Sequence, residues 1–149
     1  MALLNAGDRA PDFQLQTDEG RSVSLAALSD KPIVLFFYPK DDTPGCTIEC
    51  KEFRDARTDF IERAHVFGIS PDDVLSHQAF RDKYALNFPL LSDPGHQVAL
   101  QFGVWGPRKN FVKADWIRAL LGEASRAAFV CSSAAAARRS ERHRAPAKL

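Results

Sequence analysis

The apolar residues of the chain fall into short groups whose spacing alternates between that of a strand and that of a helix. Strand-like alternation at residues 13–15 and 23–25 lies on either side of a polar turn at residues 17–20, which predicts an N-terminal hairpin. The continuous apolar run at residues 33–38 predicts a central strand that is covered on both faces.

Helical and strand-like segments alternate after this run. They are, in order, a helix at residues 46–63, a strand at 65–69, a helix from about 70 to 84, a strand at 88–91 and a helix at 96–102. Ser70 is expected to cap the second of these helices, Pro71 fits its first turn, and Gly103 ends the last. This alternation predicts an α/β fold with a mixed sheet flanked by helices.

The pattern is less clear beyond Trp105. Residues 114–121 have helical composition, and residues 127–131 have the composition of a closing strand. Residues 132–149 hold five Lys or Arg and one Glu, in an Ala- and Arg-rich stretch without interleaved aromatic residues. We therefore expect one domain at residues 1–131 and a basic, disordered tail at residues 132–149.

Composition excludes several classes of protein. The 149 residues are 45% hydrophobic, with 20 Lys and Arg against 19 Asp and Glu, which fits one ordinary domain with a core of its own. The longest apolar run is far shorter than the roughly 20 residues that cross a bilayer, and the first residues lack the pattern of a secretory signal. We expect a cytoplasmic protein that binds neither membrane nor nucleic acid.

Cys46 is placed where a strand has ended and a helix begins. In open α/β sheets this crevice holds ligands, and a helix N-terminus stabilises negative charge, so Cys46 is expected to react as a thiolate. Thr43 can donate a hydrogen bond, and Pro44 and Gly45 form a turn that lets backbone amides approach a small ligand. The alternative is that Cys46 is a small buried apolar residue.

The motif Pro39-x-x-x-Thr43-x-x-Cys46 resembles the active-site signature of the peroxiredoxins. The stretches that resemble the bacterioferritin-comigratory, or Q-type, subfamily are Gly7–Phe13, Phe36–Thr47, Phe53–Asp55 and Phe88–Asp93. The resemblance covers residues 5–111. It implies a thioredoxin-like fold with an N-terminal hairpin and a thiol peroxidase that reduces hydrogen peroxide and organic hydroperoxides without a cofactor.

The resemblance also implies roles for particular residues. Cys46 is the peroxidatic cysteine, whose thiolate attacks the peroxide and becomes a sulfenic acid. Thr43, the amides of Gly45 and Cys46, and a guanidinium would stabilise the charge that develops on sulfur and oxygen. Pro39 and Gly45 belong to the peroxide-binding turn. The family's usual reductant is thioredoxin or a similar dithiol, and its members of this type are monomers or weak dimers.

The arginine that should complete the site is not at the expected position. Fifteen residues past Trp105 stands Leu120, whereas the stretch that begins at Arg126 resembles the expected strand six positions late. Arg118 is a second candidate. Either a short insertion lies between Phe111 and Arg126, or the segment after Phe111 is unrelated, as a change of reading frame would produce.

Cys50 is the candidate resolving cysteine, because it lies one helical turn after Cys46. The common subfamily spacing would instead place this partner at Lys51, and other members carry it near Arg81. Alternatively, Cys50 is only a buried helix residue and the enzyme uses a one-cysteine cycle. Cys131 has no local feature that brings it to Cys46.

Other polar residues receive simpler interpretations. The histidines are widely spaced, so we expect no metal site and assign them surface or capping roles. Asp41 and Asp42 are interpreted as solvated loop charges, and Phe102 and Trp105 as core residues.

Two other functions stay open. A thioredoxin-like disulfide oxidoreductase shares the fold but uses Cys-x-x-Cys, whereas three residues separate Cys46 from Cys50. A degenerate peroxiredoxin of low activity would result if the altered C-terminal segment has removed the arginine.

Overall fold

The computed structural model describes residues 8–28, 31–57, 64–105, 117–121 and 126–132, the last two ranges as backbone only. Its elements are, in chain order, β1 (Gln14–Thr17), β2 (Ser22–Ser24), β3 (Ile33–Phe37), α1 (Pro44–Arg57), β4 (His65–Ser70), α2 (Val74–Tyr84), β5 (Leu90–Ser92), the 3-10 helix η1 (Pro94–His96), α3 (Gln97–Gln101), β6 (Ile117–Leu121) and β7 (Arg126–Ser132). Among the described residues, every helix is too short or too polar to cross a bilayer.

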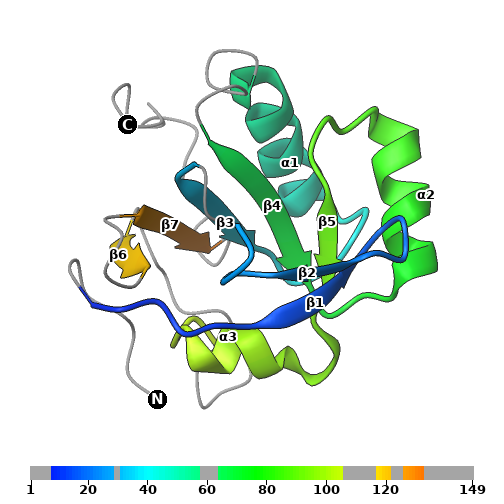
Figure 1. The fold of residues 1–149 in the computed structure, drawn as a ribbon. Helices are drawn as coiled ribbons and strands as arrows, with labels where there is room; N and C mark the ends of the chain where they lie inside the picture. The colour runs from blue at the N-terminus through cyan, green and yellow to red at the C-terminus, as the bar shows by residue number, and fades with distance from the viewer. Residues whose placement is uncertain (1–7, 29–30, 58–63, 106–116, 122–125, 133–149) are drawn as a thin grey trace.

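Within these residues, the strands form one mixed sheet in the order β2-β1-β5-β4-β3-β7-β6 (Figure 1). Strands β5, β4, β3 and β7 are parallel to one another. Strand β1 pairs antiparallel with β5 and with β2 on one side, and β6 pairs antiparallel with β7 on the other. The β1–β2 pair confirms the N-terminal hairpin, and the position of β3 confirms the central strand.

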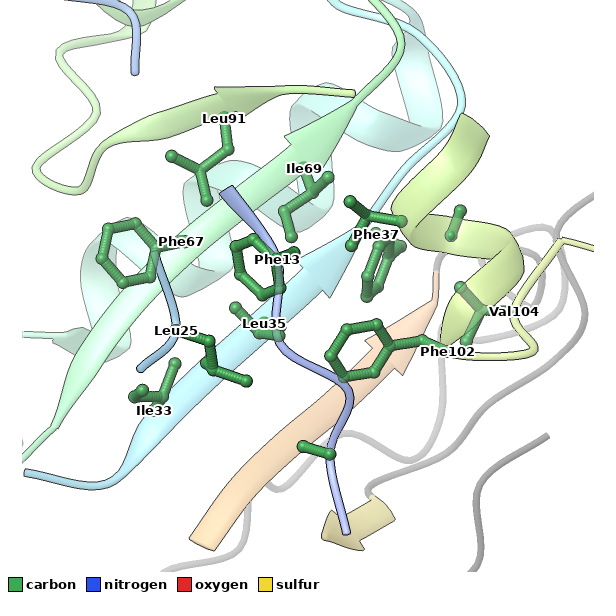
Figure 2. Close-up of a cluster of buried hydrophobic side chains, with 13 residues drawn as sticks. Phe13, Leu25, Ile33, Leu35, Phe37, Phe67, Ile69, Leu91, Phe102 and Val104 are labelled. Carbon is green, nitrogen blue, oxygen red and sulfur yellow. The ribbon is translucent and has the colours of Figure 1, made fainter. Parts of the chain in front are cut away.

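The two faces of β3 belong to two separate apolar layers. Ile33, Leu35 and Phe37 pack in one layer with the residues before β1 and with α3, as Figure 2 shows. The residues between them, Val34 and Phe36, pack in the other layer beneath α1 and α2. Burial on both faces explains why the strand is a continuous apolar run rather than an alternating one.

Several predicted boundaries differ from the structure. Helix α1 begins at Pro44, two residues before the predicted start, and residues 58–63 of the predicted helix lie outside the described residues. The prediction that Ser70 caps the next helix was wrong. Ser70 ends β4, and the N-cap is Asp73, whose side chain accepts a 2.8 Å hydrogen bond from the amide of Ser76. Asp, like Ser, is a favoured N-cap, so a run of such residues leaves the first turn ambiguous.

The C-terminal segment also departs from the prediction. Residues 117–121, predicted to be helical, form strand β6, which pairs antiparallel with β7. Strand β7 is therefore not at the edge of the sheet, but lies between β3 and β6. Ala and Leu favour helices only weakly as single residues, and pairing with a neighbouring strand overrides that preference. The predicted tail, apart from Ser132, lies outside the described residues.

Gly68 on β4 is a point of close approach in the layer beneath α1 and α2. A Cβ atom at Gly68 would lie 2.7 Å from Cδ2 of Leu90 and 3.2 Å from Cε1 of Tyr38. The absence of a side chain therefore lets Tyr38 and Leu90 pack over β4.

We expect Gly68→Ala to lower the free energy of unfolding by about 1–3 kcal/mol, because the added methyl overpacks a dense layer. Denaturant unfolding of this variant, of Leu90→Ala and of the double variant measures the effect. The double variant should lose less than the sum of the two single losses, since Leu90→Ala removes the clashing atom. An additive result would contradict this account of the packing.

Candidate active site

The connection between β3 and α1 positions Cys46. Strand β3 ends at Phe37, the loop of residues 38–43 follows, and Cys46 is the third residue of α1. The amide of Thr47 donates a 2.9 Å hydrogen bond to the carbonyl of Thr43, so Thr43 is the N-cap residue. Pro44 follows in the first helical position, where proline is favoured. Cys46 therefore lies in the first turn, at the carboxyl end of the central strand, as predicted.

This first turn offers hydrogen-bond donors to a small ligand. Helix geometry leaves the amides of Gly45 and Cys46 without a carbonyl partner in a preceding turn, and the helix dipole favours negative charge there. The Thr43 hydroxyl donates a 2.9 Å hydrogen bond to the carbonyl of Lys40. It must rotate away from Lys40 before it can donate to a peroxide oxygen. Pro39 and Gly45 are both exposed at this turn.

Cys46 and Cys50 are both thiols that form no disulfide, and both lie in the apolar layer between the sheet and α1. Cys46 is 4% exposed and Cys50 is fully buried. The layer also holds Phe36 and, at its margin, Phe53, whose ring centroids lie 4.8 Å apart. A small oxidant can reach the nearly buried Cys46 after a small displacement of the residues that cover it. A disulfide on another protein could reach Cys46 only after a much larger displacement.

The interpretation of Asp41 as a solvated charge was wrong, because its side chain is buried. Its Oδ1 accepts a 2.6 Å hydrogen bond from the Tyr38 hydroxyl, and its Oδ2 accepts one of 2.8 Å from Ser76. The amide of Asp41 donates to Oδ2 of Asp72 at 2.8 Å. These contacts attach the loop before Cys46 to the end of β3 and to the start of α2.

Asp42 attaches the same loop to the other end of α2, and its side chain is exposed as predicted. Its carboxylate accepts hydrogen bonds from Lys83 at 2.7 Å and from the Tyr84 hydroxyl at 2.6 Å. These two bonds, that of Lys83 first, lower the pKa of Asp42 and hold it ionised. Asp42 has φ 55°, a left-handed conformation that Asp tolerates better than most residues.

His77 has neither of the roles predicted for the histidines, because it is fully buried. Its Nδ1 lies 2.7 Å from Oδ2 of Asp41, and its Nε2 lies 3.1 Å from the carbonyl oxygen of Leu91. Ligand atoms of Asp41, Asp72 and His77 lie within 4.8 Å of one another. Hydrogen bonds from Tyr38, Ser76 and the Asp41 amide already engage these carboxylates, so the group forms a hydrogen-bond network.

The structure does not bring Arg126 beside Cys46. Strand β7 runs parallel to β3 with Ala128 opposite Ile33, so Arg126 lies at the amino end of β3, whereas Cys46 follows its carboxyl end. Arg118 lies on β6, opposite Phe129 of β7. Cys131 lies on β7, the strand next to β3, opposite Phe36.

Lys51 and Arg81, the positions at which the resemblance implies a resolving cysteine in other members, have other contacts here. The Lys51 ammonium lies 5.0 Å from the ring centroid of Tyr84. Arg81 donates a 2.8 Å hydrogen bond to Asp18, which ties α2 to the turn of the N-terminal hairpin.

Phe102 and Trp105 belong to the layer on the opposite face of the sheet from the thiols. Phe102 is fully buried, and Trp105 stacks on His96 with ring centroids 3.5 Å apart. The interpretation of Phe102 as a core residue is confirmed, whereas Trp105 is partly buried and packs against this cluster from outside.

Comparison with known proteins agrees with this geometry. The family model described as AhpC/TSA matches residues 6–136. Peroxiredoxin Bcp of Bacillus subtilis is 46% identical over 111 residues, which cover 74% of this chain and 71% of that protein. The chloroplastic peroxiredoxin Q of Oryza sativa subsp. japonica is 46% identical over 102 residues, and the match covers 68% of this chain and 47% of the rice protein.

A solved structure confirms the thioredoxin-like fold. The crystal structure of peroxidoxin BcpB from Mycobacterium tuberculosis superimposes with a TM-score of 0.66 at 41% identity, over 73% of each chain. The chain therefore belongs to the AhpC/TSA family, as a peroxiredoxin of the Bcp and Q group.

We expect Thr43→Val to lower kcat/KM for hydrogen peroxide by about 100-fold, because it removes a donor from the developing oxyanion. Thr43→Ser should retain most of the activity. Thr47→Val makes the same change beside Cys46 without altering the N-cap and is the control. Stopped-flow peroxide consumption measures all three, and equal losses for Thr43→Val and Thr47→Val would contradict the role of Thr43.

The register of β7 predicts that Arg126→Ala and Arg118→Ala each change kcat/KM by no more than about twofold. Neither backbone position lies at the carboxyl end of β3. A loss above about tenfold in either variant would show that its guanidinium reaches the peroxide.

Proposed function

We propose that this chain reduces hydrogen peroxide and organic hydroperoxides through Cys46. The Cys46 thiolate attacks the terminal peroxide oxygen, the O–O bond breaks, and water or an alcohol leaves while the sulfur becomes a sulfenic acid. One observation carries the proposal: Cys46 lies in the first turn of α1, at the carboxyl end of β3, and Thr43 is the N-cap residue of the same turn. Pro39 and Gly45, which are both exposed, are the proposed peroxide-binding residues of this turn.

We infer that Cys50 resolves the sulfenic acid. Both thiols are buried in one layer and lie one helical turn apart. Residues at this spacing have Cβ atoms about 5–6 Å apart, whereas a disulfide needs about 3.8 Å. The first turn of α1 must therefore unwind locally when the disulfide forms. Thioredoxin or a similar dithiol is the proposed reductant that opens it.

The alternative of a protein disulfide oxidoreductase is disfavoured by burial. A thiol that attacks a protein disulfide must be exposed to a surface of another chain, and Cys46 is only 4% exposed. The three residues between Cys46 and Cys50 also differ from the Cys-x-x-Cys spacing of such enzymes. Two further alternatives are a one-cysteine cycle and a peroxiredoxin of low activity. The products and the rate of the reaction with hydrogen peroxide distinguish them.

The compartment, oligomeric state, domain bounds and partners of the enzyme are also part of this proposal. We propose a cytoplasmic monomer or weak dimer, with residues 1–131 as the domain and residues 132–149 as a basic tail. A reducing compartment suits two thiols that must be regenerated after each turnover. The proposed partners are a peroxide and a dithiol reductant, with no cofactor, nucleic acid or membrane.

We expect one equivalent of hydrogen peroxide to convert the reduced enzyme to a Cys46–Cys50 disulfide, because the second thiol condenses with the sulfenic acid. Intact mass and peptide mapping should show a loss of two hydrogens in this pair. Cys50→Ser should stop at the sulfenic acid, and Cys46→Ser should consume peroxide no faster than a free thiol.

Each contrary result has a separate meaning. A stable sulfenic acid in the unaltered enzyme would establish a one-cysteine cycle. Peroxide consumption as slow as that of Cys46→Ser would establish a chain of low activity. Rapid reduction of insulin disulfides without peroxide turnover would favour the oxidoreductase.

A further inference from the structure

The Thr43 side chain is bound to the loop that precedes it. An N-cap threonine usually accepts a hydrogen bond from the backbone amide two or three residues further on. In the described part of the chain, the Thr43 hydroxyl instead donates a 2.9 Å hydrogen bond to the carbonyl of Lys40, three residues before it. The position of the Lys40 carbonyl therefore decides where the Thr43 hydroxyl lies.

The Lys40 carbonyl belongs to a peptide group that is hydrogen-bonded at both ends. The other end of this group is the amide of Asp41, which donates a 2.8 Å hydrogen bond to Oδ2 of Asp72. A peptide group is planar, so its carbonyl and its amide turn together. Rotation of this peptide away from Thr43 would therefore break the bond to Asp72 as well. A hydrogen bond from the amide to a carboxylate also polarises the peptide and strengthens its carbonyl as an acceptor.

Asp72 is itself fixed to the carboxyl ends of two strands. Ser70 ends β4 and donates a 2.6 Å hydrogen bond to Oδ2 of Asp72, and the Asp72 amide donates to the Ser70 hydroxyl oxygen at 3.2 Å. Ser92 ends β5, and its hydroxyl donates a 2.6 Å hydrogen bond to the carbonyl of Asp72. The sheet therefore sets the position of the carboxylate oxygen that accepts from the Asp41 amide.

A continuous series of hydrogen bonds runs from the sheet through Asp72 and the Lys40–Asp41 peptide to Thr43. We propose that Asp72 is a positioning residue for peroxide reduction, because it fixes the orientation of the Thr43 side chain in the turn before Cys46. The inference rests on the proposed role of Thr43 as a donor to the peroxide. When Thr43 donates, its hydroxyl hydrogen rotates away from the Lys40 carbonyl while its oxygen stays in place.

A fixed Thr43 oxygen matters because the charge that it stabilises exists only in the transition state. A donor that is already in position has no cost of reorganisation at that moment, and a misplacement of about 1 Å can slow a reaction about 100-fold. Without the bond to Asp72, the peptide can turn and the Thr43 oxygen gains other positions. The hydroxyl is still present, so the loss should be smaller than the loss for Thr43→Val.

The loop keeps its other attachments when Asp72 is altered. The Asp41 carboxylate accepts hydrogen bonds from the Tyr38 hydroxyl at 2.6 Å and from Ser76 at 2.8 Å. Neither bond involves the backbone amide of Asp41. A substitution at Asp72 should therefore release the Lys40–Asp41 peptide and leave the Asp41 side chain bound to the end of β3 and to α2.

Asp72→Ala tests the proposal, because it removes the acceptor of the Asp41 amide, whereas Asp72→Asn keeps an acceptor oxygen. Asp73→Ala is the matched control. Asp73 is the neighbouring carboxylate and caps α2 through the Ser76 amide, so its loss weakens the start of the same helix and leaves Asp72 in place. Stopped-flow mixing with hydrogen peroxide measures the second-order rate constant of sulfenic acid formation, for each variant with Thr43 and with Thr43→Val.

We expect Asp72→Ala to slow sulfenic acid formation about tenfold and Asp72→Asn to stay within about threefold of the parent. Asp73→Ala should match the parent within about twofold. In the Thr43→Val background, Asp72→Ala should lower the rate by no more than about twofold further, because the hydroxyl that it positions is already gone. A residue that only stabilised the fold would slow the reaction equally in both backgrounds.

Equal slowing by Asp72→Ala with and without the Thr43 hydroxyl would overturn the proposal. A parent rate for Asp72→Ala, or an equal loss for Asp73→Ala, would overturn it too, and Thr43 would keep its proposed role if Thr43→Val alone is slow. If Thr43→Val matches the parent, the role of Thr43 fails and the inference fails with it. Should Asp72→Ala not fold, Asp72→Ser, whose side chain is shorter than that of Asp, replaces it with the same expected results.

Discussion

The buried carboxylate of Asp41 is the constraint on which the arrangement of the site depends. It joins three parts of the chain that are distant in sequence: the end of β3 through Tyr38, the loop before Cys46, and α2 through Ser76 and His77. A buried carboxylate is tolerated only where hydrogen bonds replace those it would make to water. Tyr38, Ser76 and His77 each supply one such bond to Asp41. The helix that carries the thiols therefore starts from a fixed point.

Much of the frame follows from local pattern. The apolar run of residues 33–38 predicted the central strand because burial on both faces leaves no polar position. The strand–loop–helix order then placed Cys46 at the carboxyl end of that strand, and the backbone agrees. The hairpin followed from alternation and a polar turn. These features depend on residues close together in sequence, which is why one sequence sufficed.

What sequence reasoning missed depends on contacts between distant residues. Asp41 and His77 are 36 positions apart, and nothing near either residue indicates that they meet. Strand β6 was mistaken for a helix because its pairing with β7, rather than its composition, decides its conformation. The sequence also did not predict the direction of β7 relative to β3. This direction determines at which end of the sheet Arg126 lies.

The division of the core by β3 has a further consequence for the motions of the enzyme. Among the described side chains, those of α1 pack in the cluster that contains the two thiols, whereas the hairpin and α3 pack in the other cluster. Sub-global opening of the N-terminal turn of α1 can therefore proceed without exposing the second cluster to solvent. Amide hydrogen exchange in the first turn of α1 should therefore be faster than in β3 and β4, whose other face stays covered when this turn opens.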